Sequence, residues 1–186
     1  MNTTVILLSN YIKNLPTDTE EIHADEFFDE NLPLPKIKWR DRIEYIWNPE
    51  PFTFSRFTNL THLFLDLCEL TVLPKLPPTL LVLNCAFNDL CELPELPLGL
   101  RVLQCENNKL KKLPPIHGLL YHLNCSDNNI EELDVIETQM HYLNCENNKI
   151  KKIQFQPKCN IMYFHCKGNP IQYIENFPRK LLNFSM

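Results

Sequence analysis

Glycine is scarce in this chain, with three among 186 residues. A phosphate-binding loop needs several glycines close together, so nucleotide sites of that kind are excluded. No apolar run approaches the roughly 20 residues that a membrane-spanning helix requires. The N-terminal apolar run, residues 5–8, has no basic flank and is too short for a secretory signal. These absences predict a cytoplasmic protein.

Basic patches are also missing. The chain has 18 Lys and Arg against 23 Asp and Glu, a net charge of −5. A nucleic-acid interface needs a concentrated basic face, which no segment provides. Seven of the acids lie between Thr17 and Asn31, where no Lys or Arg occurs. Thr17 and Glu20 have the spacing of a helix-capping pair. The segment is therefore interpreted either as a helical cap over the first repeats or as a flexible acidic segment that docks a basic partner.

What the chain does contain is a repeat with a period of twenty residues. Each copy opens with a leucine, followed two residues later by leucine or cysteine and, in most copies, five residues later by asparagine. The opening leucines are Leu63, Leu83, Leu103, Leu123 and Leu143. A fixed period of this length indicates a solenoid, in which each coil buries its apolar side against its neighbours. One extra residue precedes the next copy, which continues at Phe164.

The full pattern, L-x-x-L-x-(L/C)-x-x-N-x-(L/I)-x-x-(L/I), resembles the leucine-rich repeat. The resemblance implies a solenoid with a parallel β-sheet on its concave face. The pairs Leu73-Pro74, Leu93-Pro94 and Leu113-Pro114 favour an extended, polyproline-like convex side with little helix. These proline-rich repeats resemble those of bacterial effectors, and similar cysteine-containing forms occur in amoebal giant viruses. For a viral or pathogen protein of this type, the expected partner is a host protein and the expected location is the host cytoplasm.

Residues 1–186 are interpreted as a single leucine-rich-repeat domain of eight coils and a terminal strand. Residues 2–16 fit a degenerate first coil, residues 17–39 form the acidic insertion or cap, and residues 40–186 carry the regular repeats. Ile43 and Tyr45 stand twenty residues before Leu63 and Leu65. This spacing predicts that the strand beside Leu63 contains Ile43.

Cysteine and asparagine occupy fixed positions in the repeat. Five of the eight cysteines share one inward position: Cys85, Cys105, Cys125, Cys145 and Cys166. We expect them to be reduced, small buried hydrophobes that bind no metal. The asparagines follow at the turn, where their amides can satisfy backbone groups. They are expected to form a buried hydrogen-bonded row, which Cys68 interrupts.

The outward strand positions predict the surface that binds a protein partner. In the C-terminal half they combine aromatic rings with amides: His122, Asn124, Tyr142, Asn144, Tyr163 and His165. In the N-terminal half a more apolar patch is expected, made by Trp47, Phe64, Leu67, Leu81, Val82 and Phe87. That patch either binds a partner or lies under the N-terminal insertion.

Catalysis is not expected, and neither is a cofactor or a metal. Outward histidines can do acid–base chemistry, but no nucleophile or oxyanion donors accompany them. The sequence therefore favours a non-enzymatic protein-interaction module. The alternative is a self-assembling structural protein that forms a homodimer through its last rung, Leu181, Phe184 and Met186, since an open strand edge pairs readily with another.

Overall fold

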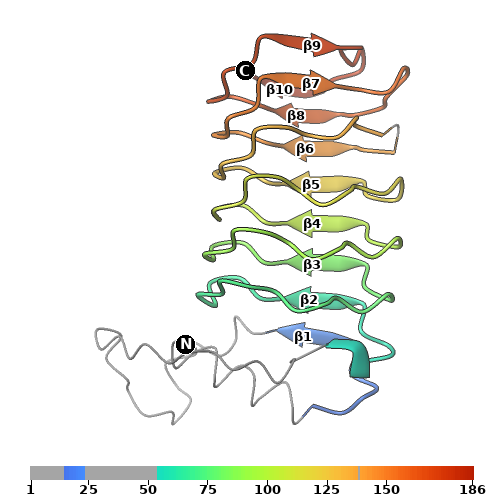
Figure 1. Cartoon of the computed structure of the whole chain (residues 1–186). Helices are drawn as coiled ribbons and strands as arrows, with labels where there is room; N and C mark the ends of the chain where they lie inside the picture. The colour runs from blue at the N-terminus through green and yellow to red at the C-terminus, as the bar shows by residue number, and fades with distance from the viewer. Residues whose placement is uncertain (1–14, 24–53, 138) are drawn as a thin grey trace, which may run out of the picture.

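The computed structural model describes residues 15–23, 54–137 and 139–186. Strands of three residues stack in parallel into an elongated solenoid (Figure 1). Eight of them form one sheet: β1 (Glu21–His23), β2 (His62–Phe64), β3 (Val82–Asn84), β4 (Val102–Gln104), β5 (His122–Asn124), β6 (Tyr142–Asn144), β8 (Tyr163–His165) and β10 (Asn183–Ser185). The predicted leucine-rich-repeat architecture is confirmed.

The register of the sheet follows the twenty-residue period. Leu83 pairs with Leu63 on one side and with Leu103 on the other. The extra residue lies between β6 and β8, where Leu143 pairs with Phe164. Successive side chains of a strand point to opposite faces, so the central residue of β2 to β6 is buried and both its neighbours are partly exposed. The sheet therefore has one core face and one outer face.

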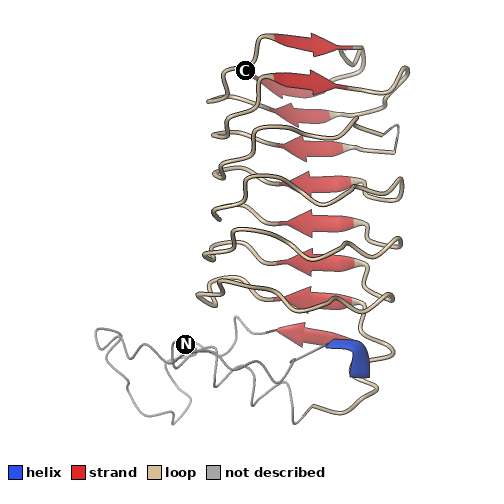
Figure 2. Ribbon diagram, in the orientation of Figure 1, coloured by secondary structure: helices blue, strands red, loops and turns tan. Residues whose placement is uncertain are grey.

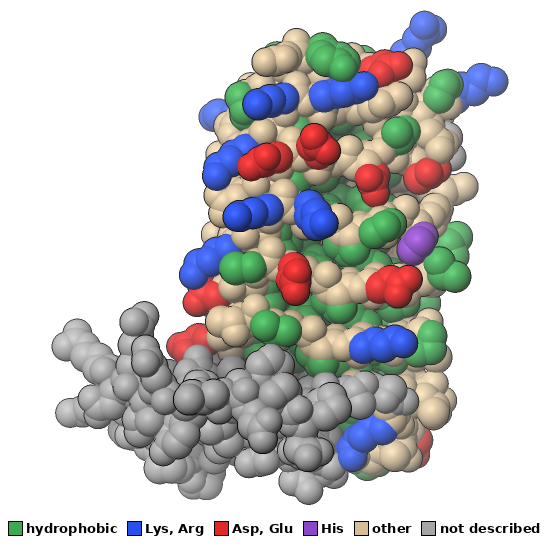
Figure 3. Space-filling view, viewed as in Figure 1, with side chains coloured by type: hydrophobic (Ala, Val, Ile, Leu, Met, Phe, Trp, Pro, Cys, Tyr) green, Lys and Arg blue, Asp and Glu red, His purple; other side chains and the backbone are tan. Residues whose placement is uncertain are grey.

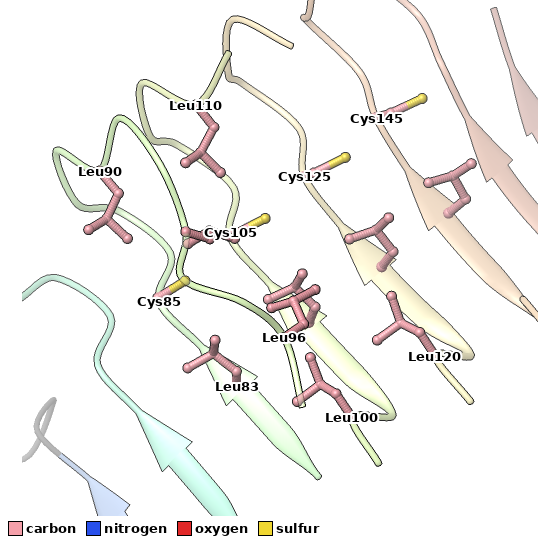
Figure 4. Close-up of a cluster of buried hydrophobic side chains, with 14 of the residues drawn as sticks. Leu83, Cys85, Leu90, Leu96, Leu100, Cys105, Leu110, Leu120, Cys125 and Cys145 are labelled. Carbon is pink, nitrogen blue, oxygen red and sulfur yellow. The ribbon is translucent and has the colours of Figure 1, made fainter. Parts of the chain in front are cut away.

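The core is a continuous stack of leucine, isoleucine, phenylalanine and cysteine side chains. Cys85, Cys105, Cys125 and Cys145 point into the interior together with the leucines of the same coils (Figure 4). Each of these four thiols is fully buried, and so is the Leu83 side chain at the centre of β3. The inward position predicted for the cysteine row is confirmed.

A row of buried asparagines links each coil to the one before it. Asn128 is representative: its Nδ2 donates to the carbonyls of Cys105, Cys125 and Ser126 at 2.9, 3.2 and 3.1 Å. Its Oδ1 accepts the backbone N–H of Leu110 at 2.9 Å. One side chain thus bonds four backbone groups, with its two N–H hydrogens shared among three carbonyls, of which that of Ser126 also accepts the N–H of Asn107. The same arrangement recurs at Asn88, Asn108, Asn148 and Asn169.

The other side of the solenoid is extended backbone, with a second, two-stranded sheet that the sequence did not predict. It consists of β7 (Lys152–Gln154) and β9 (Tyr173–Glu175), and an isolated bridge joins Ile136 to Phe155. Proline has no N–H to donate to a ladder. The earlier coils carry Pro74, Pro94 and Pro114 at this position, and the later coils carry Asp134, Gln154 and Glu175. Ladder hydrogen bonds form only where the prolines are gone.

At the N-terminal end the structure corrects two predictions. The strand that pairs with β2 is β1, which sets Ile22 opposite Leu63 in the place expected for Ile43. Ile43 lies outside the described residues. The helix expected to start at Thr17 is also wrong, since residues 17–18 form a turn and Glu21–His23 is a strand. Ile22 is 1% exposed, so the alternation of this strand buries one apolar side chain among acids.

Little helix is present in the described part of the chain. One short 3-10 turn, η2 (Phe54–Arg56), precedes β2, as Figure 2 shows. Phe54 and Phe57 are each 1% exposed and extend the core toward β1. Residues 2–14 and 24–53, which include most of the predicted first coil and the insertion, lie outside the described residues.

Candidate functional site

The outer face of the eight-stranded sheet carries three rows of side chains in its C-terminal half. The aromatic row is His122, Tyr142 and Tyr163. The amide row is Gln104, Asn124 and Asn144. The acidic row is Glu106 and Glu146 at one repeat position, with Asp127 of the coil between them one residue further along the chain. In the aromatic and amide rows each successive coil contributes one residue, because the strands are in register. Four of the six predicted partner-binding residues belong to two neighbouring strands, β5 and β6.

The aromatic row is ordered by ring stacking. The His122 and Tyr142 rings are parallel within 4°, with centroids 4.2 Å apart. Tyr142 also contacts the rings of Tyr163 and His165, at 6.3 and 6.1 Å. Burial lowers the pKa of His122, so this imidazole is neutral at neutral pH. Burial likewise raises the pKa of Tyr142. The row therefore presents uncharged, pre-ordered ring edges to solvent, and Tyr163 is 41% exposed.

The amide row is oriented by its own backbone. The Oδ1 of Asn144 accepts the N–H of Glu146 at 3.1 Å. The Oδ1 of Asn124 accepts the N–H of Ser126 at 3.3 Å. With the oxygens held this way, Nδ2 is the donor end of each amide. The Asn144 side chain also hydrogen-bonds the Tyr142 side chain, so the amide row is held in a fixed orientation beside the aromatic row.

The two glutamates of the acidic row have different surroundings. Burial raises the pKa of Glu106, and the nearby carboxylates of Asp66 and Asp127 add to this shift. Glu106 Oε2 is shielded from solvent and accepts no hydrogen bond. Glu146 Oε1 accepts a 2.6 Å hydrogen bond from Ser185 Oγ, which lies 2.9 Å from His165 Nδ1. His165 is therefore placed by β10 as well as by its own strand.

This Glu–Ser–His chain does not have the order of a hydrolytic triad. In a triad the imidazole lies between the nucleophile and the carboxylate, so that it can take the hydroxyl proton. Here Ser185 lies in the middle and donates to Glu146. The arrangement holds the side chains of β8 and β10 to the coil of β6. Within the described ranges no group of three or more His, Cys, Asp or Glu side chains is placed to hold a metal ion.

The N-terminal half of the outer face carries exposed apolar residues in an unusual backbone conformation. Leu67 and Phe87 have φ values of 56° and 53° and are 57% and 50% exposed. The same repeat position is occupied by Asn107, Asp127 and Asn147 in the next coils, residue types that accept this left-handed region more readily. Comparing this position between coils could have revealed the exception from sequence. Trp47 of the predicted patch lies outside the described residues, and the covering of the patch stays a prediction.

Charged pairs run along the solenoid away from the outer face. Rows of Lys and Arg alternate with rows of Asp and Glu in Figure 3. The exposed pairs are Lys111–Lys112, Glu131–Glu132 and Lys151–Lys152. Two salt bridges on the molecule, Lys109–Asp89 at 2.6 Å and Lys152–Glu175 at 3.5 Å, join adjacent coils. Pairs this exposed are screened by solvent, so they contribute little to stability and serve solubility and register.

The thiols differ sharply in accessibility, which gives a test of the fold. Seven cysteines are buried and Cys91 is exposed. Burial raises the pKa of Cys125 to about 12 and that of Cys166 to about 11, and it raises the pKa of Cys85 as well. We expect a thiol reagent near pH 8 to label Cys91 rapidly and the other seven only after unfolding.

The same shifts fix the sign of a pH effect. Unfolded thiols ionise near their ordinary pKa, while the folded chain keeps them protonated, so unfolding releases protons at high pH. Stability is therefore expected to be constant below about pH 8 and to fall above about pH 9. Rapid labelling of several thiols in the folded protein would contradict the buried row, and a Cys91→Ala control should abolish the fast phase.

The residues predicted for self-association lie at the C-terminal end of the sheet. Leu181 packs against the core, while Phe184 and Met186 are 40% and 75% exposed. The Phe184 ring contacts Phe164 and Phe177, with centroids 5.5 and 5.2 Å away. β10 pairs with β8 along one edge. A homodimer through this rung stays a prediction.

Comparison with known proteins identifies the fold. No protein-family model matches the sequence, and no curated protein matches it. The leucine-rich-repeat domain of a Shigella effector matches 62% of this chain and 62% of its own length, with 28% identity and a TM-score of 0.53. YopM, a leucine-rich effector protein from Yersinia pestis, matches 60% of this chain and 32% of its own length, with 32% identity and a TM-score of 0.57.

The match spans less than two thirds of either structure. None of the helical residues in the described part of the chain forms a segment long and apolar enough to cross a membrane. The parallel register, the asparagine row and these two structures lead to one conclusion: the chain is a leucine-rich-repeat solenoid similar to the repeat domains of bacterial effectors.

Proposed function

We propose that this chain is a non-enzymatic interaction module that binds a protein partner through the outer face of its eight-stranded sheet. The observation that carries the proposal is the pre-ordered aromatic row, in which His122 and Tyr142 stack in parallel at 4.2 Å. Aromatic side chains that are already held in place lose little conformational freedom on binding. The amide donors of Asn124 and Asn144 lie beside them and add directional hydrogen bonds.

The partner is proposed to be a host protein, met in the host cytoplasm by a viral or pathogen protein. The support for this is the likeness to two effectors, from Shigella and from Yersinia pestis. Binding by the acidic N-terminal segment is the competing route, because residues 17–31 are rich in acids. The two routes predict different effects of substitution.

Tyr142→Ala is expected to weaken binding of the partner by about 2 kcal/mol, which raises the Kd roughly thirtyfold, because aromatic side chains near an interface centre are frequent hot spots. Its thermal stability should change little, since the side chain lies on the outer face. The measurement is the Kd, by interferometry, of a partner isolated from host cytosol on the wild-type chain. The matched control is Tyr173→Ala, which removes a 53% exposed tyrosine of β9 from the other sheet.

A weaker Kd with Tyr142→Ala and an unchanged Kd with Tyr173→Ala would support the outer face. If only Glu20→Lys and Glu21→Lys weaken the partner, the acidic segment is the binding element and the proposal fails. Light scattering on the wild-type chain in the same experiment reports whether the binding species is a monomer or a self-associated form.

A further inference from the structure

The acidic row has a spacing that a partner can match. Glu106 and Glu146 occupy equivalent positions beyond β4 and β6, two coils apart. Neighbouring strands of a sheet lie about 4.8 Å apart, so the two positions are separated by about 10 Å along the solenoid axis. Ser126, in the coil between them, is 6% exposed. The two carboxylates therefore stand on either side of a small buried residue.

The acidic row has no basic partner among the residues that the structure describes. Glu106, Asp127 and Glu146 form no ion pair there, since the salt bridges join His62–Glu21, Lys109–Asp89 and Lys152–Glu175. Asp127 accepts a 2.8 Å bond from Asn147, and Glu146 accepts one from Ser185. The first basic side chain at the position of Glu106 and Glu146 is Lys167, one coil further on. The face is thus acidic along one edge and aromatic along the other.

The geometry of the aromatic row limits the class of ligand. The facing sides of the His122 and Tyr142 rings cover each other. A sugar that binds by lying flat on an aromatic ring cannot enter between these two rings. The ring edges and the 41% exposed Tyr163 can instead contact aliphatic side chains such as proline rings, which aromatic surfaces recognise in extended peptides.

We infer that the outer face binds an extended, polyproline-II-like segment of a protein partner that carries Arg or Lys at every third residue. This inference rests on the proposed function and names the partner's chemistry. A polyproline-II chain rises about 3.1 Å per residue with three residues per turn, so residues three apart lie on one side, about 9.3 Å from each other. That distance matches the two-coil separation of Glu106 and Glu146. A β-strand places residues three apart on opposite sides and cannot use both carboxylates.

The amide row completes the fit. The carbonyls of a polyproline-II segment have no internal hydrogen bonds and need external donors. Asn124 and Asn144 lie between the aromatic and acidic rows in strand order, with Oδ1 held by the backbone of their own coils and Nδ2 as the donor end. The basic side chains of the peptide then meet the acidic row at one edge of the face, and its prolines meet the aromatic row at the other edge. Its backbone carbonyls lie over the amide row in the middle.

The test uses the full chain and fluorescein-labelled peptides, with Kd measured by fluorescence anisotropy. One peptide repeats Arg-Pro-Pro, a second has the same composition with its arginines consecutive, and a third repeats Glu-Pro-Pro. We expect the first to bind more tightly than the second and the third not to bind. The double variant E106Q/E146Q should weaken the first peptide about tenfold, as two partly exposed ion pairs are lost. The control E131Q/E132Q removes two exposed acids elsewhere and should leave the Kd unchanged.

Three results would overturn the inference. Equal affinity for the peptide with spaced arginines and the peptide with consecutive arginines would show that the protein does not distinguish the arginine spacing. Equal loss in E106Q/E146Q and E131Q/E132Q would show that only net charge matters. A wild-type dimer in light scattering that E106Q/E146Q dissociates would make the occupant a second copy of this chain.

These outcomes are separate from the proposed function. If the peptide fails to bind while a host partner is still lost in Tyr142→Ala, the inference falls and the interaction module stands. If neither the peptide nor the partner responds to Tyr142→Ala, the outer face is not the binding surface.

Discussion

Replacing Phe155 by alanine is expected to lower the free energy of unfolding by about 3–5 kcal/mol. Its side chain is 0% exposed and meets Phe164 edge-on, at 84° with centroids 5.1 Å apart. Phe164 belongs to the main sheet, and Phe155 follows β7 of the second sheet. The pair therefore fills the space between the two walls of one coil, and truncation leaves a cavity that neighbouring coils cannot close. Urea unfolding followed by circular dichroism measures the effect.

Two controls make the Phe155 result specific. Phe155→Leu keeps most of the buried volume and should cost less than about 1.5 kcal/mol. Phe177→Ala removes the same ring from a residue that is 46% exposed and should cost about 1 kcal/mol or less. A similar loss for Phe155→Ala and Phe177→Ala would mean that the two walls are not packed as the structure shows.

Asn128→Ala is expected to destabilise the protein by about 1–3 kcal/mol. The substitution removes the side chain that bonds three carbonyls and one N–H between coils, and the carbonyls of Cys105 and Cys125 and the N–H of Leu110 lose this partner. An apolar replacement cannot form these bonds, and the interior is too closed for water to take its place freely. The midpoint of thermal unfolding should fall by several degrees, about 2–4 °C for each kcal/mol lost in a chain of this size.

The matched control lies one residue away. Asn129 is only partly buried and its side chain forms none of the bonds of the buried row, so Asn129→Ala should stay within about 0.5 kcal/mol of the wild-type protein. If Asn128→Ala is as stable as the wild-type protein, water must already reach the asparagine row, and the register assigned to the repeat is wrong.

Much of the fold could be predicted because it depends on local periodicity. A twenty-residue period aligns Leu83, Leu103 and Leu123 in register as soon as one coil is placed on the next. The inward cysteines and the buried asparagines follow from the same alignment. All six predicted partner-binding residues belong to the aromatic or amide row or contact it directly, as His165 contacts Tyr142. The outward direction of these side chains was fixed by strand alternation alone.

The sequence failed where the period breaks. Ile22 and Leu63 pair across 41 positions, and no multiple of the repeat joins them. The twenty-residue period predicts Ile43 beside Leu63. In the structure the neighbouring strand is instead the one that buries Ile22, and the Glu20 carbonyl beside it accepts the N–H groups of Thr61 and His62. The second sheet was missed for a related reason. Its strands pair only where backbone N–H and C=O groups of successive proline-free coils come within hydrogen-bonding distance, and the composition of the coils does not give that distance.

The sequence by itself determined the solenoid, its register and the chemical type of each row, because these follow from periodicity and from the alternation of side chains along a strand. Only the tertiary structure decided how the rows are used. The parallel contact of His122 and Tyr142, the bond from Ser185 to Glu146 across 39 positions and the solvent-shielded Oε2 of Glu106 depend on side-chain rotamers of neighbouring coils. Those rotamers are set by packing between residues far apart in the chain, which no local pattern records.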